Sequence, residues 1–364
     1  MKISVVVPAE LDEALRQRWL QFQAVQPLLS SPCFAPEFTL AAGQARRDVR
    51  VAIIEDAGEV AGFFPFQQRW GAGRPAGGRL SDHHGLIHHP QLDWDWRELL
   101  RACGLGYWQY DHLPACQRPP GSATYAVSPG LDLSEGFEAY RRRRLDAGAR
   151  RLAELPRKAR KLAREVGPLR FEVDSRDPAV LAWVMKLKSQ QCRRTGAQDC
   201  FAPAWAREFV ERIAAIDEPH FGGRLSVLYA GDRPVAAHFG MRSPHVWHWW
   251  FPVYSREHGA YSPGALLLMM LAEKVAAQGH RLLDLGKGDE SYKASFADTG
   301  TALVEGCVMR ASPVTSLRHA RKRLGRWLRQ SPLAFPVRPL LRQFGRLTAC
   351  APLVPWALAA TDLS

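Results

Sequence analysis

Residues 261–296, YSPGALLLMMLAEKVAAQGHRLLDLGKGDESYKASF, decide the fold that the sequence predicts. Pro263 suits the first turn of a helix, where its missing N–H costs nothing. Residues 265–277 are strong helix formers, and Gly279 follows them where a C-cap glycine belongs. A short apolar strand at 282–285 comes next. The stretch therefore predicts a turn, a helix, a strand and then a polar loop.

The start of this helix is an expected site for a negatively charged ligand. Backbone N–H groups in the first turn have no partner within the helix, and the helix dipole favours negative charge there. We expect this turn to bind a cofactor that carries pyrophosphate, although an ordinary turn has the same composition. Its residues are Ser262, Pro263, Gly264 and Ala265.

The bulk composition is that of an ordinary globular protein. The chain has 364 residues, of which 46% are hydrophobic and 23% charged, so it is long enough for two domains. The helix quoted above is shorter than the roughly 20 apolar residues that span a bilayer, and the first residues lack the apolar core of a signal peptide. Seven scattered cysteines, never in C-x-x-C spacing, argue against a zinc site and a disulfide framework. We expect a cytoplasmic protein.

Positive charge is in excess and is unevenly distributed. Lys and Arg number 49 against 36 Asp and Glu, a net charge of +13. Residues 141–164 hold eleven Arg or Lys and two acids, and residues 318–346 hold nine and no acid. Such charge suits nucleic acid, anionic lipid or phosphorylated ligands. No zinc-finger, helix-turn-helix or RNP signature accompanies it, so specific nucleic-acid binding is not expected.

Two distant segments share a strand–turn–strand pattern. Residues 49–67 indicate two strands joined by a turn at 56–59, and strands at 225–229 and 235–241 are joined by a turn that contains Gly231. Each hairpin is followed by a helix and then by a strand after a glycine. The separation of about 175 residues indicates a weak internal duplication of one α/β unit.

The chain is expected to have four parts. They are an N-terminal domain (1–134), a basic helical connector (135–170) that Pro156 breaks or kinks, a C-terminal domain with the donor site (171–312), and a basic amphipathic tail (313–364). The other predicted elements are strands at 3–7, 107–111, 171–173 and 245–251, helices at 11–22, 92–102, 179–194 and 203–216, and loops at 33–38 and 71–90.

This pattern resembles the GNAT-type acyltransferases of the CelD/BcsL group, which are associated with cellulose and other exopolysaccharide synthesis. It is also similar to the FemAB aminoacyltransferases that build peptidoglycan cross-bridges. The resemblance runs from Ser31 to Met309, and the last two of its motifs are the most specific because their order and spacing coincide with the family. The motifs are SPCFAPEF, VAIIEDAGEVAGFFPF, SDHHG, YAGDRPVAAHFG, YSPGALLL and DLGKGDESYK.

The resemblance implies an α/β (α+β) fold of tandem GNAT-like domains, each a mixed and mostly antiparallel sheet flanked by helices. It also implies direct transfer, in which an acceptor amine or hydroxyl attacks the thioester of an acyl-CoA with help from a general base and no metal. One motif departs from the family. The usual acyl-CoA loop, a Gln or Arg followed by x-x-G-x-G or x-x-G-x-A, is replaced by Ser262-Pro263-Gly264. An aminoacyl donor therefore stays open.

The polar loop after the predicted strand supplies most candidate catalytic residues. Asp284 stands at a strand end, where a carboxylate can act as a base or bind a sugar hydroxyl, or simply form a salt bridge. Tyr292 can donate to a leaving thiolate, and Lys293 can bind a phosphate or carboxylate. Among their neighbours, Gly286 and Lys287 are expected to bind the cofactor, and Asp289 and Glu290 the substrate.

Three histidines and a tryptophan complete the candidates. His238, in the apolar strand VAAHFG, can be a general base or a hydrogen-bonded core residue. His83 and His84 are expected to line the acceptor cleft rather than to bind a metal, because no Cys or carboxylate framework matches them. Trp249 belongs to an aromatic strand and is a core residue or a stacking surface for a sugar ring.

The predicted function is transfer of an acyl group, acetyl first among the candidates, from acyl-CoA to a sugar amine or hydroxyl in cell-envelope glycan synthesis. The expected partner is a glycan or a lipid-linked sugar. Residues 316–328 of the tail fit a helix on the anionic inner membrane surface, and fit equally a helix packed on the core. The alternatives are a FemAB-like transfer from aminoacyl-tRNA and a non-catalytic basic binding module.

Overall fold

Local sequence signals position the main elements of the fold. The computed structural model describes residues 1–121, 123–288 and 290–310. Helix α8 begins at Pro263, and Gly279, with a φ of +89°, follows its end as expected. The first hairpin turns at Ala57 and Gly58, both with positive φ, which matches the right-handed twist of its strands.

Described residues form fourteen strands and nine α-helices. The strands are β1 (Lys2–Val6), β2 (Val49–Asp56), β3 (Glu59–Arg69), β4 (Ala72–Pro75), β5 (Ile87–His88), β6 (Tyr107–Pro114), β7 (Thr124–Asp132), β8 (Leu169–Ser175), β9 (Asp217–Glu218), β10 (Phe221–Ala230), β11 (Arg233–Arg242), β12 (Val246–Tyr254), β13 (Leu282–Asp284) and β14 (Thr299–Met309). The helices are α1 (Glu13–Val25), α2 (Pro36–Ala45), α3 (Trp96–Ala102), α4 (Phe137–Asp146), α5 (Arg150–Glu165), α6 (Pro178–Thr195), α7 (Ala204–Ala215), α8 (Pro263–Ala277) and α9 (Ser291–Phe296).

One large, mostly antiparallel sheet carries the fold, in the order β1-β2-β3-β4-β6-β14-β7-β13-β12-β11-β10-β8. The strands follow the same pattern from each end of the sheet toward its middle. We call the half that begins with β1 the N-terminal unit and the half that begins with β8 the C-terminal unit. The hairpin β2–β3 corresponds to β10–β11, and the parallel pair β4–β6 corresponds to the parallel pair β12–β13. This correspondence confirms the predicted tandem α/β fold and the duplication seen in the two hairpins.

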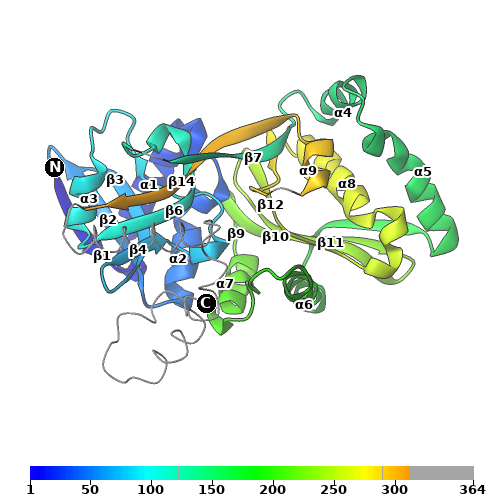
Figure 1. The fold of residues 1–364 in the computed structure, drawn as a ribbon, viewed down its shortest axis with the longest axis horizontal. Helices are drawn as coiled ribbons and strands as arrows, with labels where there is room; N and C mark the ends of the chain where they lie inside the picture. The colour runs from blue at the N-terminus through cyan, green and yellow to red at the C-terminus, as the bar shows by residue number, and fades with distance from the viewer. Residues whose placement is uncertain (122, 289, 311–364) are drawn as a thin grey trace, which may run out of the picture. The chain divides into compact units, whose positions relative to one another are not determined.

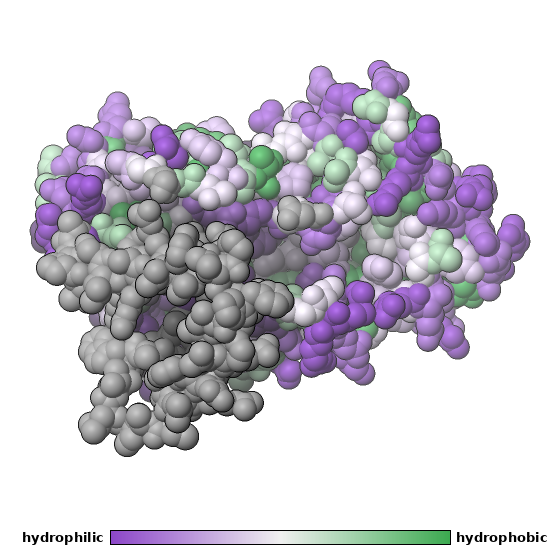
Figure 2. All heavy atoms as spheres, in the orientation of Figure 1, coloured by the Kyte–Doolittle hydropathy of each residue, from purple (hydrophilic) through white to green (hydrophobic). Residues whose placement is uncertain are grey.

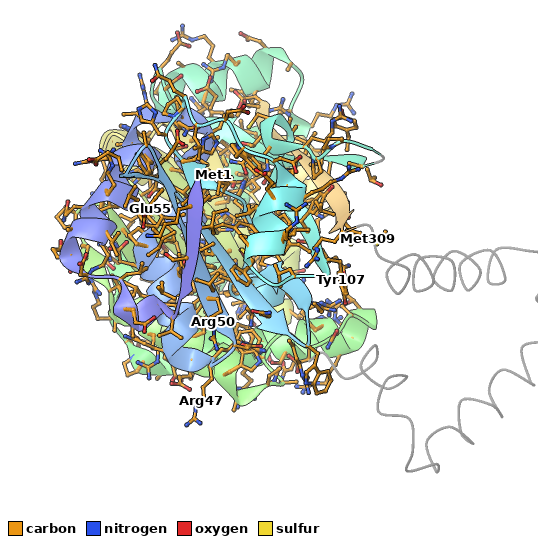
Figure 3. The ribbon with its side chains drawn as sticks, turned by 90° about the vertical axis from the view of Figure 1, so that its left-hand side faces the viewer. Met1, Arg47, Arg50, Glu55, Tyr107 and Met309 are labelled. Carbon is orange, nitrogen blue, oxygen red and sulfur yellow. The ribbon has the colours of Figure 1, made fainter. Side chains whose placement is uncertain are left out.

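The last strand of each unit lies in the other unit. β7 follows β6 along the chain but pairs with β13, whereas β14 lies beside β6, and β7 and β14 pair antiparallel in the middle of the sheet. Figure 1 shows both strands running alongside each other between the two halves. Figure 3 labels Tyr107 and Met309, the first residue of β6 and the last of β14, at the same end of these neighbouring strands.

Helices cover both faces of the strands of the C-terminal unit. Helices α6 and α7, together with α2 from the N-terminal unit, enclose a core around Phe209, Phe239 and Trp250. Helices α5, α8 and α9 enclose a second core on the opposite face, around Trp249, Leu267 and Phe296 (Figure 1). Strand β12 contributes to both cores: Trp247 and Trp249 belong to the second, and Trp250, Phe251 and Val253 belong to the first.

Three predictions of local structure were wrong. Residues 71–90, expected as a loop, contain the short strands β4 and β5. Residues 33–38, expected as a loop, contain the start of α2, because Pro36 occupies the first turn of the helix rather than punctuating a loop. Pro156 does not break the basic connector. It lies inside α5, which Leu152, Leu155 and Leu162 anchor on both sides of the proline, and the break falls at Gly148 instead.

Residues 1–308 form one compact unit. The predicted domain boundaries near 135 and 171 fall inside it and stay a prediction. The basic tail predicted for 313–364 lies outside the described residues. Among the helices that are described, none has the length and apolar character needed to cross a bilayer.

A β-bulge interrupts the pairing of β11 with β12. Phe239 pairs with Phe251 and Met241 pairs with His248, so Gly240 faces the two residues Trp249 and Trp250. The N–H of Trp250 is thereby released from the ladder, and it donates instead to Nε2 of His238 at 3.2 Å. Bulges of this kind redirect side chains and are frequent beside functional sites.

We expect Gly240→Ala to destabilise the fold, because an added Cβ would lie 2.2 Å from the carbonyl oxygen of His248 and 2.4 Å from the ring of His238. Overpacking of this kind costs about 1–3 kcal/mol. Urea unfolding measures the loss. Gly259→Ala is the matched control, since its nearest neighbour would be 3.9 Å away. Equal stability of the two variants would contradict the close approach at the bulge.

Candidate active site

The parallel strands β12 and β13 separate directly after His248 and Asp284, two buried residues that carry charge. They pair only at Val246–Leu282, Trp247–Leu283 and His248–Asp284. Strand β13 ends at Asp284, whereas β12 continues to Tyr254. His248 and Asp284 therefore lie side by side at the point where the two strands diverge.

His248 lies between two carboxylates. Its Nδ1 is 3.3 Å from Oδ2 of Asp284, and its Nε2 is 3.2 Å from Oδ2 of Asp82, which belongs to the loop before β5. The ring is fully buried, and Asp284 is 2% exposed. A ring nitrogen can donate to a carboxylate only when it carries a proton, and both nitrogens donate here. The geometry therefore requires an imidazolium.

Acid–base properties of the three groups agree with this reading. Burial lowers the pKa of His248, but hydrogen bonds to Asp284 and Asp82 outweigh it and raise the pKa to about 9. Burial raises the pKa of Asp82, but the His248 hydrogen bond and the charge of His112 lower it to about 2. The same opposition, between burial and the interactions with His83 and His248, holds the pKa of Asp284 well below its ordinary value.

Four donors occupy both oxygens of the Asp284 carboxylate. His83 donates from Nε2 at 2.7 Å, and His248 donates to the same oxygen. The hydroxyl of Ser128, on β7, and the N–H of Gly286, at 3.0 Å, donate to the other. A carboxylate so fully hydrogen-bonded is a weak base, so its contacts suit it better to orienting a neighbouring group.

The buried cluster extends to solvent through alternating carboxylates and imidazoles. Nε2 of His112 lies 3.6 Å from Oδ1 of Asp82, and its Nδ1 lies 3.0 Å from Oδ1 of Asp111. The exposed fraction of the side chain rises from 12% at His112 to 51% at Asp111. This order of groups links the buried imidazolium of His248 to the surface.

His84, next to His83, has a structural role. Its Nε2 accepts the N–H groups of Asp111 and His112 at 3.2 and 3.1 Å, and its Nδ1 faces the carbonyl of Ser81 at 3.4 Å. Burial lowers the pKa of His84 to about 3. His84, Asp111 and His112 have the spacing of a metal site, but both nitrogens of His84 are already hydrogen-bonded, so it has no lone pair to offer. The residues present do not fit a metal.

His238 and Trp249 lie on the opposite face of the sheet from His248. Their rings stack at 4.1 Å, and Nε2 of His238 accepts the bulge N–H of Trp250. Burial lowers the pKa of His238 well below its ordinary value. With its lone pair engaged, His238 has the contacts of a core residue, the alternative given for it above.

The polar loop after β13 is held mainly by its own ammonium groups. Lys293 is 5% exposed, donates to the carbonyls of Gly286 and Lys287 at 3.0 and 3.3 Å, and pairs with Glu290 at 2.9 Å. Lys287 donates to the carbonyl of Asp111 at 2.7 Å. Of the remaining candidates, Tyr292 is half-buried against the core that contains Trp249, and Asp289 lies outside the described residues.

The start of α8 lies at the far end of β12 from the cluster. Ser262 has a φ of +55° and precedes the helix without a side-chain cap. Nζ of Lys158, on α5, donates to its hydroxyl at 2.8 Å. An ammonium beside the positive end of a helix dipole is unfavourable by itself, and an anion bound between them would remove the conflict. Gly264 follows, and a Cβ there would meet only the ring of Tyr254, at an ordinary contact distance of 3.5 Å.

The structure thus brings together candidates from opposite ends of the sequence. His83, Asp284 and Gly286 meet at the cluster, Lys287 and Lys293 brace its loop, and the α8 turn is separate. Sequence reasoning missed the four residues that complete the cluster. They are Asp82, His112, Ser128 and His248.

Part of the chain matches a known domain family. Residues 148–294 match the family model described as an acetyltransferase (GNAT) domain. No curated protein matches the chain. The chain therefore contains a GNAT-type acetyltransferase domain, which implies an acyltransferase. His248 and Asp284 lie inside the matched segment, whereas Asp82, His83 and Ser128 lie outside it.

Solved structures share the fold over most of the chain. FemX is 10% identical and has a TM-score of 0.53, over 87% of this chain and 99% of that one. The C-terminal DUF2156 domain of an Agrobacterium fabrum protein, named as a lysylphosphatidylglycerol synthetase, is 14% identical, with a TM-score of 0.53 over 84% and 93%. Identities this low show the fold alone. Membership in the CelD/BcsL group stays a prediction.

We expect His248→Ala to lower the free energy of unfolding, because the buried Asp284 and the partly exposed Asp82 would lose their shared cation. Breaking a buried ion pair in this way costs about 3–5 kcal/mol. Urea unfolding at pH 7 measures it. The control is His245→Gln at an exposed histidine, expected to change stability by less than about 0.5 kcal/mol. A loss below about 1 kcal/mol in His248→Ala would argue against the buried imidazolium.

Stability is also expected to depend on pH through His248. The titratable groups around its ring are Asp82, Asp284 and His83, and His238 acts on it electrostatically from the other face of the sheet. Its pKa is about 9 in the folded protein against 6.5 ordinarily, so the contribution is fully present below pH 6.5. It is lost as the pH rises through 9, a change on the order of 3 kcal/mol. Urea titrations at pH 6 and 9.5 should show this loss in the wild type and not in His248→Ala.

Proposed function

We propose that the protein transfers an acyl group, acetyl first among the candidates, from acyl-CoA to an amine or hydroxyl of a sugar in cell-envelope glycan synthesis. One observation carries the proposal. Within the segment that matches a GNAT domain, the parallel strands β12 and β13 diverge directly after the buried pair His248 and Asp284. A thioester placed in that divergence would present its carbonyl to this pair.

The geometry of β12 supports a donor site between the cluster and α8. Beyond His248, residues 249–254 of β12 have no β13 partner on that edge. At about 3.3 Å per residue they span about 20 Å, which suits an extended pantetheine arm. The arm would begin at the start of α8, where Lys158 and Ser262 suit the pyrophosphate.

The acceptor is proposed from the resemblance to the CelD/BcsL group, and the charge of the cluster is compatible with it. Asp82, whose side chain is 23% exposed, offers a carboxylate to a sugar ammonium. A hydroxyl acceptor would donate its hydrogen bond to the same Asp82 carboxylate, since four donors already occupy Asp284. Either acceptor must lose a proton to react.

We expect the wild type to bind acetyl-CoA at micromolar concentration in a calorimetric titration, because its phosphates suit the α8 turn. Gly264→Trp should weaken binding at least tenfold by filling that turn. Ala182→Trp, at an exposed position on α6, is the matched control and should bind like the wild type. No heat with acetyl-CoA or CoA, from protein that unfolds cooperatively, would remove acyl-CoA as the donor.

A second donor, an aminoacyl-tRNA, is favoured by one surface. On α4 and α5, five exposed arginines have no carboxylate partner among the described residues. Figure 2 shows hydrophilic side chains covering the end of the molecule where Figure 1 places these helices. Guanidinium groups bind phosphates with paired hydrogen bonds, which a nucleic-acid backbone can use repeatedly. The five are Arg142, Arg150, Arg151, Arg157 and Arg160.

If tRNA is the donor, its affinity should fall steeply with salt, because binding releases counterions. Each phosphate contact adds about 0.9 to the slope of log K against log salt on duplex regions. The double variant Arg157→Gln, Arg160→Gln should lower the slope by about 2 in fluorescence anisotropy. Arg101→Gln, on α3 at the opposite end of Figure 1, is the control. A slope unchanged by the double variant would exclude α5 as the tRNA surface.

A further inference from the structure

We infer that His83, from the N-terminal unit, is the general base of the transfer and that Asp284 positions it. The inference rests on the acyltransferase function proposed above. It makes the active site composite, because the base lies outside the segment that matches the GNAT domain.

The hydrogen bond between His83 and Asp284 fixes which nitrogen of the ring is free. Nε2 of His83 lies 2.7 Å from Oδ2 of Asp284, with the two side chains 3% and 2% exposed. An ionised carboxylate only accepts, so Nε2 carries the proton and Nδ1 keeps its lone pair. This is the arrangement in which a buried carboxylate orients an imidazole so that its other nitrogen can take a proton.

Nδ1 of His83 is available to a substrate. Among the described residues it has no hydrogen-bond partner. It is also not among the side-chain atoms that are both fully buried and without a hydrogen-bond partner, such as Nδ1 of His238 and Nε2 of His280. It therefore borders space that a small group can reach. The other histidines of the site cannot serve, because both nitrogens of His248 donate and the lone pair of His238 accepts a backbone N–H.

The backbone holds His83 in a strained conformation. Its φ of +142° is rare for a residue with a Cβ, and such strain persists only where the surroundings enforce it. Ser81 donates its hydroxyl to the carbonyl of His83, and the next residue, His84, is fixed by the backbone of β6. The loop thus presents the ring of His83 to Asp284 from two rigid supports.

The step balances with these groups alone. An ammonium acceptor first loses one proton to solvent. The N of the neutral amine, or the O of a hydroxyl, then forms a bond to the thioester carbonyl carbon as Nδ1 of His83 takes its remaining proton, and the C–S bond then breaks. The thiolate leaves with the electron pair of that bond and receives the proton from Nδ1, which restores the neutral ring. Throughout, Asp284 keeps Nε2 protonated and stabilises the imidazolium that forms.

The test compares His83→Gln and His83→Gly with the wild type in turnover of the acyl donor. Gln can still donate to Asp284, and Gly relieves the positive φ, so both variants should fold. General-base catalysis contributes typically 10²–10⁴-fold, so kcat should fall by about that factor while the dissociation constant of the acyl donor stays within threefold. Added imidazole should restore part of kcat in His83→Gly and none in Asp284→Asn. His245→Gln is the control.

Retention of kcat within threefold in His83→Gly, with the wild-type pH profile, would overturn the inference. A second measurement does not depend on the substrate. Nitrogen-15 correlation spectra of the histidines should show the Nε2–H tautomer for His83 in the wild type, and a mixture in Asp284→Asn. The Nδ1–H tautomer in the wild type would overturn the inference whichever acyl donor is used. Absence of turnover with every donor tried, together with the expected tautomer, would instead count against the proposed function.

Discussion

A buried imidazolium between two carboxylates, one buried and one partly exposed, joins the N-terminal and C-terminal units of this chain. His248 and Asp284 come from neighbouring strands of the C-terminal unit, and Asp82 comes from a loop of the N-terminal unit. A buried charge without its partner costs several kcal/mol, so each of the three groups fixes where the other two can lie. The loop that carries Asp82 must therefore lie against β12. The position of His83 beside Asp284 follows from that constraint, because His83 is the next residue.

Exchange of the final strands makes the constraint effective. β7 belongs to the N-terminal unit by sequence but pairs with β13, and it brings Ser128 to the same carboxylate that His83 and His248 contact. Donors to Asp284 thus come from both units. A GNAT-like unit that consisted only of residues 148–294 would have the strand divergence and lack half of the polar groups around it. The N-terminal unit is part of the site rather than only a structural partner.

Short-range signals predicted the elements whose causes are local. Helix α8 and the two hairpins follow from a proline, glycines and periodicity within a few residues, and they were confirmed. Strands β7 and β14 were missed, because their pairing depends on the other unit and their exposed ends lack a clear alternation.

Asp284 was recognised from its place at a strand end. His248 was not, because the meaning of a histidine in an aromatic strand depends on Asp82, 166 residues away. His83 and His84 are adjacent and identical, and only the tertiary structure separates a strained ring beside Asp284 from one fixed to the backbone.

Charge along β12 gives a donor one favourable direction. At one end, Lys158 and the start of α8 are positive, and the arginines of α5 lie on the same helix as Lys158. At the other end, two carboxylates share one imidazolium. The positive end near α8 would attract a polyphosphate, and the carboxylates at the other end would repel it. Charges inside the protein are screened less than charges in water, so this contrast is felt more strongly there. The acyl-CoA donor proposed above, with phosphates at one end and a neutral thioester at the other, would therefore be oriented before any specific contact forms. A cationic acceptor, as proposed, would approach the cluster from the opposite side. In this proposal, the distribution of charge along β12, rather than the size of the net charge of +13, orients the donor.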